Sequence, residues 1–159
     1  MEGKIIIVGA TGYTGSALAK LLKQENIDCH LIGRNESELQ KLANKTGQPF
    51  SVCSNVSDEQ SVNESLSSIA NDKILGFAYC VGSIVLKSFQ TTKSEDFINT
   101  FNLNVTGAIL FIKKLQKQLA ENNGSIVLFS TVAVDRGFNM HSVISTAKGA
   151  IQGLTTSLA

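Results

Sequence analysis

The stretch KIIIVGATGYTG, from Lys4 to Gly15, decides the fold. The β-branched run Lys4–Val8 predicts a short strand, and apolar residues at helical spacing predict a helix over Tyr13–Gln24. The three glycines of the stretch, Gly9, Gly12 and Gly15, therefore lie where the strand ends and the helix begins. Glycines in that turn let the backbone approach a pyrophosphate closely, and the helix N-terminus offers free N–H groups to it. We therefore interpret the stretch as a dinucleotide-binding turn.

Apolar runs and helical patterns alternate along the rest of the chain. Further strands are predicted at Cys29–Ile32, Phe50–Cys53, Ile74–Tyr79 and Ile126–Phe129. Helices are predicted to begin at the caps Asn35 and Ser57, to run from Ser94, along one apolar face from Phe101 to Leu119, and over Ser142–Leu158. Strands that alternate with helices form βαβ units. The sequence therefore predicts an α/β fold, a three-layer doubly wound parallel sheet of the Rossmann type.

Length and composition limit the class of protein. The chain has 159 residues, is 43% hydrophobic and carries a net charge of +1, so we expect one domain over residues 1–159. The balanced charge argues against nucleic acid or an anionic membrane as partner. Apolar runs such as Ile5–Val8 are far shorter than the ~20 residues that span a bilayer. The N-terminus Met1–Lys4 lacks the features of a signal peptide, so we expect a cytoplasmic protein.

The three cysteines are an odd number and have no CxxC spacing. Cys29, Cys53 and Cys80 each lie in or beside a predicted strand, which is typical of buried, reduced thiols. Only two histidines, His30 and His141, are present, so the sequence predicts no metal site.

The end of the second predicted strand indicates which cofactor is preferred. An NAD site expects a carboxylate about 20 residues after the glycine turn, where it holds the ribose hydroxyls. Here that position carries Arg34, and Glu36 suits the first turn of the following helix on dipole grounds. A guanidinium can stack on adenine and bind a 2′-phosphate. We therefore predict NADP(H) rather than NAD(H).

Later segments carry a family resemblance. Asn55-Val56 after the third strand resembles an Asp-Val segment, and Cys80-Val81-Gly82 stands in the place of an Asn-Ala-Gly segment. Asn104-Val-Thr-Gly107 matches an Asn-x-x-Gly motif, and the residues from Ser145 through Lys148 match a catalytic helix. With these motifs the chain resembles the short-chain dehydrogenase/reductase family from its first strand to its last residue.

The resemblance implies a set of site residues. Implied cofactor-binding residues are Gly9, Thr11, Gly12, Tyr13, Thr14, Gly15, Arg34, Asn55, Val56, Cys80, Gly82 and Lys148. Implied catalytic residues are Asn104, Thr131 and Lys148, where Thr131 takes the place of the family's catalytic hydroxyl when counted back from Lys148.

The chain departs from the family at the catalytic tyrosine. The family uses Tyr-x-x-x-Lys, and Ile144 stands four residues before Lys148. Isoleucine has no proton to give, and general acid catalysis is typically worth about 10²–10⁴-fold. His141 is the neighbouring side chain with a pKa suited to proton transfer, so we include it as a candidate substitute acid.

Two functions of different classes remain open. The first is an NADP(H)-dependent short-chain oxidoreductase of a small carbonyl or alcohol substrate, with a degenerate catalytic tetrad. The second is a non-catalytic NADP(H)-binding protein that senses redox state or acts as a scaffold. A third interpretation, a nucleotide-sugar epimerase or an isoflavone-reductase-like enzyme, rests on the glycine turn alone.

The resemblance also implies a longer protein and an assembly. The family sheet continues with two more strands that are absent from this chain, so we expect residues 1–159 to be an N-terminal fragment. In the family the long helix and the final helix form a dimer face, which here would include Leu110, Phe111 and Leu154. We therefore expect a homodimer or homotetramer in the full-length form.

Overall fold

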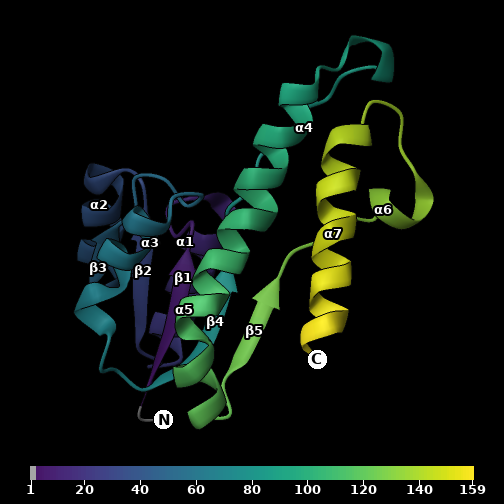
Figure 1. Ribbon diagram of the computed structural model, residues 1–159. Coiled ribbons are helices and arrows are strands. Elements are labelled where there is room, and N and C mark those ends of the chain that lie inside the picture. The colour runs from purple at the N-terminus through teal and green to yellow at the C-terminus, as the bar shows by residue number, and fades with distance from the viewer. Residues whose placement is uncertain (1–2) are drawn as a thin grey trace.

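One parallel sheet forms the centre of the molecule. In the computed structural model, which describes residues 3–159, five strands lie in the order β3-β2-β1-β4-β5 (Figure 1). They are β1 (Lys4–Val8), β2 (Cys29–Gly33), β3 (Phe50–Val52), β4 (Ile74–Tyr79) and β5 (Ser125–Leu128). Every pair is parallel, and the predicted α/β doubly wound sheet is confirmed. The chain changes direction of travel across the sheet between β3 and β4, which opens a crevice at the carboxyl ends of β1 and β4.

Helices cover both faces of the sheet. The α-helices are α1 (Tyr13–Gln24), α2 (Glu36–Thr46), α3 (Glu59–Leu66), α4 (Ser94–Phe101), α5 (Gly107–Glu121), α6 (Ala133–Arg136) and α7 (Ser142–Leu158). Two 3₁₀ turns, η1 (Ser67–Ile69) and η2 (Phe89–Thr91), and one π-helical turn, η3 (Asn102–Thr106), complete the chain. Helices α1 and α2 pack on one face, whereas α3, α5 and α7 pack on the other.

Side chains of the central strand alternate between these two layers. Ile7 packs with α1 and α2, whereas Ile6 and Val8 pack with α3 and α5, and all three are fully buried. The edge strand β5 differs. Its Val127 pairs with Ala78 of β4, lies on the α1 and α2 side of the sheet, and is 49% exposed. The core is therefore complete around β1 and open on one side of β5.

The structure corrects several local expectations. The third helix is capped by Asp58, which accepts the N–H of Ser61, and not by Ser57. The long apolar face does not begin at Phe101, which is exposed, because η3 interrupts the helix there. Phe111, expected on the dimer face, is fully buried in the core.

Cys29 and Cys53 are buried and Cys80 is half-buried, and all three are free. Within the described chain no three His, Cys, Asp or Glu side chains gather as metal ligands would. None of the helices of residues 3–159 combines the length and the apolar character needed to cross a membrane. The first two residues of the N-terminal segment considered for a signal peptide lie outside the described part.

Candidate functional site

A cleft of about 360 Å³ lies where β1, β2, β3 and β4 end. Its lining residues are Val8, Gly9, Thr11, Gly12, Gly33, Arg34, Cys53, Ser54, Asn55, Val56, Cys80, Val81, Gly82, Ser83 and Leu103. Eight of the twelve residues predicted to bind the cofactor are among them. The parallel strands bring these residues together because their carboxyl ends meet at one edge of the sheet.

The glycine turn forms one wall of the cleft. Gly9 has φ +81°, and a Cβ there would lie 2.9 Å from both the Cys80 carbonyl carbon and the Val81 nitrogen. A Cβ on Gly15 would overlap the Gly9 carbonyl oxygen. Gly12 is the N-cap of α1 and places no side chain over the first N–H groups of the helix. The turn is therefore a cradle with free backbone donors, which fits a phosphate group.

Three predicted residues of the turn do not line the cleft. Gly15 is buried beneath the turn, where it lets the helix approach the strand. Tyr13, which is 95% exposed, and Thr14 point to the surface from the first turn of α1. Their backbone N–H groups, rather than their side chains, are the groups that face a ligand at the helix end.

Arg34 lies at the opposite wall, directly after β2. Its guanidinium is exposed and makes no ion pair among residues 3–159. The next residue, Asn35, accepts the N–H of Glu38 at 3.2 Å and begins α2, as predicted. The cap fixes the backbone beside Arg34 and leaves the cation free for an anionic ligand.

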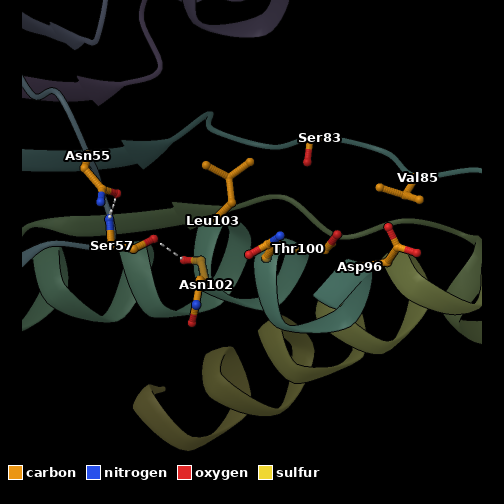
Figure 2. A pocket seen from close by; sticks show the side chains of 9 residues that line it. Asn55, Ser57, Ser83, Val85, Asp96, Thr100, Asn102 and Leu103 are labelled. Carbon is orange, nitrogen blue, oxygen red and sulfur yellow. Dashed lines mark hydrogen bonds between the residues drawn. The ribbon is translucent and has the colours of Figure 1, made fainter. Parts of the chain in front are cut away.

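A second cavity, of about 440 Å³, continues from this wall (Figure 2). It shares Asn55, Ser83 and Leu103 with the cleft. The Asn55 side chain accepts the Ser57 N–H at 3.0 Å, and the Ser57 hydroxyl donates to the Asn102 carbonyl at 2.9 Å, as Figure 2 shows. These bonds connect the loop after β3 to the π-helical turn η3.

The structure brings Asn104 and Lys148 together beside Gly82, which lines the cleft, and this place is called the floor of the cleft below. A Cβ on Gly82 would lie 3.1 Å from Asn104 Oδ1 and 3.8 Å from Lys148 Nζ. Asn104 is fully buried, and its Nδ2 donates to the Thr100 carbonyl at 2.9 Å. Its Oδ1 has no partner among the described residues. A buried acceptor without a partner is costly, so this atom is set to bind a group that enters the cleft.

Lys148 is half-buried and makes no ion pair within residues 3–159. Burial lowers the pKa of its ammonium below the usual value. The cation therefore lies in a place where hydroxyl groups of a ligand would stabilise it.

Thr131 and Ser130 follow β5. The Thr131 hydroxyl accepts the Ala133 N–H at 3.3 Å and keeps its proton to donate elsewhere. The Ser130 hydroxyl donates to the Lys148 carbonyl at 3.3 Å and is used in anchoring α7. Of the two adjacent hydroxyls, Thr131 is thus the one whose proton is not donated to the protein backbone.

Ile144 and His141 occupy the first turn of α7 and the residue before it. Ile144 is buried. His141 Nδ1 donates to the Asn139 carbonyl at 2.7 Å, and its ring packs edge-on against Phe138. The seven residues to Lys148 span about 10 Å along the helix axis, so the structure does not bring His141 to the floor of the cleft.

Sequence reasoning missed two residues beside this floor, Leu103 and Tyr79. Tyr79 ends β4, and its hydroxyl donates to the Leu103 carbonyl inside η3 at 2.7 Å. In the sequence, Tyr79 looks like one more apolar residue of a strand. No local pattern indicates that its hydroxyl binds the carbonyl of Leu103, 24 residues later.

The chain belongs to the short chain dehydrogenase family, whose sequence model matches residues 3–159. It is 26% identical over 157 residues to Carbonyl reductase family member 4 of Xenopus laevis, covering 96% of this chain and 66% of that protein. It is 28% identical over 157 residues to the 3-oxoacyl-(acyl-carrier-protein) reductase FabG of Rickettsia typhi, covering 96% and 64%. The chain thus spans about two thirds of the length of these relatives.

Solved structures share the fold. A short-chain dehydrogenase/reductase from Vibrio parahaemolyticus superposes with a TM-score of 0.86 at 24% identity, covering 97% of this chain and 76% of that one. At 24% identity this similarity supports the fold alone.

Proposed function

We propose that this protein is an NADP(H)-dependent short-chain oxidoreductase of a carbonyl or alcohol substrate. The observation that carries the proposal is the convergence of Asn104 Oδ1 and Lys148 Nζ beside Gly82, a residue that lines the cleft. Names of the relatives, a carbonyl reductase and an oxoacyl reductase, support the same reaction class.

The residues present fit a phosphorylated dinucleotide. The cradle at Gly9 and Gly12 would hold the pyrophosphate, Arg34 the 2′-phosphate, and Lys148 the hydroxyls of the second ribose. When bound, NADP(H) supplies or accepts the hydride. Asn55 and Val56 would flank the adenine wall.

The protein's own groups would polarise the substrate and manage one proton. Thr131 keeps a hydroxyl proton that can be donated to a carbonyl oxygen, and Asn104 Oδ1 can hold a water beside Lys148. Ile144 has no proton to donate, and His141 lies about 10 Å along α7 from Lys148, so the proton would come from water. The His141 Nδ1–H is used in a hydrogen bond to the Asn139 carbonyl. We expect slow reduction of generic ketones as a result.

The second candidate is a non-catalytic NADP(H)-binding protein that reports redox state or acts as a scaffold. The buried Ile144 in place of a tyrosine favours it. The two candidates share the cleft and differ only in whether a hydride is transferred.

We also propose that the protein works in the cytoplasm as a homodimer or homotetramer. Leu110 of α5 and Leu154 of α7 are partly buried at the edge of the core, and this surface is the one that would pair.

Titration of NADPH and NADH by calorimetry tests the cofactor. One charge-assisted contact from Arg34 to the 2′-phosphate contributes about 1.5–3 kcal/mol, or about 10- to 150-fold in affinity. We expect Arg34→Ala to remove this preference, whereas Arg136→Ala, the other arginine, on α6, keeps it. Equal affinity of the wild type for both cofactors would contradict the proposal, and hydride transfer to a ketone panel separates enzyme from sensor.

A further inference from the structure

The π-helical turn η3 leaves one backbone carbonyl without its helical donor. The Gly107 N–H bonds the Asn102 carbonyl, five residues back, instead of the Leu103 carbonyl that an α-helix would use. The Tyr79 hydroxyl donates to that Leu103 carbonyl at 2.7 Å. A side chain from the sheet thus takes the place of a backbone amide.

Gly107 leaves the space that the Tyr79 phenol occupies. A Cβ on Gly107 would overlap the Tyr79 hydroxyl oxygen and would lie 3.0 Å from Val56 Cγ2. The phenol therefore reaches η3 through a gap that only a residue without a side chain leaves open.

The ring itself is fixed by the core. Tyr79 is 3% exposed, and its ring centroid lies 6.2 Å from that of Phe77 and 6.3 Å from that of Phe111. Burial raises the pKa of the phenol above its usual range, so the hydroxyl keeps its proton and stays a donor.

Asn104 lies in the middle of η3, next to the carbonyl that Tyr79 binds. Its Nδ2 is held by Thr100, and its unpartnered Oδ1 points to Gly82 and Lys148. Closure of η3 into an α-helix would rotate Asn104 about the helix axis, because each residue of an α-helix turns by about 100°.

We propose that Tyr79 is a positioning residue for the reaction, whose hydroxyl holds η3 open and thereby aims Asn104 Oδ1 at the floor of the cleft. The inference rests on the proposed function, in which Asn104 and Lys148 serve hydride transfer. The alternative is that Tyr79 contributes only its ring to the core.

Tyr79→Phe tests this, because it removes the hydroxyl and keeps the ring. We expect backbone amides of residues 103–107 to exchange with solvent about fivefold or more faster, since one hydrogen bond is lost. We expect the NMR signals of the Asn104 side-chain amide to shift. Tyr13→Phe removes the exposed hydroxyl of the other tyrosine and should leave both readouts of η3 unchanged.

Kinetics then separate positioning from packing. In Tyr79→Phe we expect kcat for ketone reduction to fall about 10- to 100-fold while KM for NADPH stays within about threefold. Gly107→Ala displaces the phenol. If this variant folds, it should likewise lower kcat and leave the KM for NADPH nearly unchanged.

The outcomes are distinct. Unchanged exchange and unchanged Asn104 signals in Tyr79→Phe would overturn the inference, whatever the activity. Changed signals with kcat intact would also overturn it, because Asn104 would then need no aiming. Changed signals in a protein that transfers no hydride with or without the hydroxyl would refute the proposed function, while the structural hold of Tyr79 on Asn104 would stand.

Discussion

The two halves of the sheet, one side with β3, β2 and β1 and the other side with β4 and β5, build their parts of the site differently. Around β1 the backbone itself makes the site: Gly9 packs against the main chain of Cys80 and Val81, and Gly15 packs against Gly9. Around β5 and α7 side chains make it: the Ser130 hydroxyl anchors the Lys148 carbonyl, and the Tyr79 phenol holds η3.

This difference teaches which parts of the site tolerate change. A backbone cradle excludes every side chain and fails when one Cβ is added. A site made of side chains can lose one group and keep its frame. Cofactor binding and chemistry are therefore separable in this fold.

The largest effect should come from adding one methyl group to the cradle. Gly9→Ala forces a Cβ to within 2.9 Å of the Val81 nitrogen and keeps a left-handed φ. We expect a loss of roughly 3–4 kcal/mol in the free energy of unfolding, from overpacking and backbone strain, with NADPH binding lost. Gly153→Ala on α7, where nothing lies within 4 Å, should instead be neutral or stabilising. The free energy of unfolding is measured with urea. Similar losses in Gly9→Ala and Gly153→Ala would show that the two sides tolerate an added methyl group equally.

The β2 side should also carry an acid-sensitive histidine. His30 is 3% exposed, its Nε2 lies 2.7 Å from the Ser51 hydroxyl, and burial, aided by the charge of Lys4, lowers its pKa to about 4. The unfolded chain binds the proton from about pH 6.5, so stability is unaffected above that pH and falls as the pH drops from 6.5 to 4. The loss approaches about 3 kcal/mol.

Unfolding of His30→Gln over the same pH range gives the control. The difference in free energy of unfolding between wild type and His30→Gln should fall between pH 6.5 and 4. Parallel curves for wild type and His30→Gln would show that His30 is protonated equally in both states.

On the proposed function, a phenol introduced on the β5 and α7 side should raise activity. Ile144→Tyr places a hydroxyl one helical turn from Lys148, whose charge should lower the pKa of the phenol. We expect ketone reduction to rise about 10²-fold. Ile144→Phe adds the ring without the hydroxyl and should stay slow, so the pair isolates the proton. An Ile144→Tyr protein that binds NADPH and remains inert across ketones and alcohols would favour the sensor.

The smallest effect should lie on the open side of β5. Val127→Thr exchanges a methyl for a hydroxyl at a position that is 49% exposed, and we expect a change in stability within about 0.5 kcal/mol. Val8→Thr, the same exchange at a fully buried position of β1, should cost about 1–3 kcal/mol. Equal costs in thermal unfolding would show that β5 is covered in solution.

Most of the architecture could be predicted because it is local. The five strands are continuous apolar runs, and the Asn35 cap, the glycine turn and the stop at Asn122 all act within a few residues. The cap of α3 was misplaced by one residue because Ser57 and Asp58 are both good cap residues and local sequence does not rank them. The four-residue helix α6 is too short to show a period.

The site needed contacts between distant segments. Asn104 and Lys148 are 44 positions apart, and only the packing of η3 and α7 beside β4 brings them to Gly82. The π-helical turn itself has no proline or other local mark. It depends on Tyr79 and Gly107, which belong to different elements. The exposure of Phe101 is set by this turn, which separates α4 from α5, whereas Phe111 is buried because it shares one face of α5 with Ala108, Ile112 and Leu115.

The order of the strands also determines when each strand can pair during synthesis on the ribosome. β1 lies between β2 and β4, and Val8 pairs with Tyr79, which is synthesised about 70 residues later. At about 5–20 residues per second, the nascent chain holds the KIIIV segment with at least one open edge for roughly 4 to 14 s. Gly9 cannot complete its contact with Cys80 before then. The cradle is thus the first motif to be translated but cannot form until about half of the chain has been synthesised, and a chaperone that shields residues 4–8 would act in that interval.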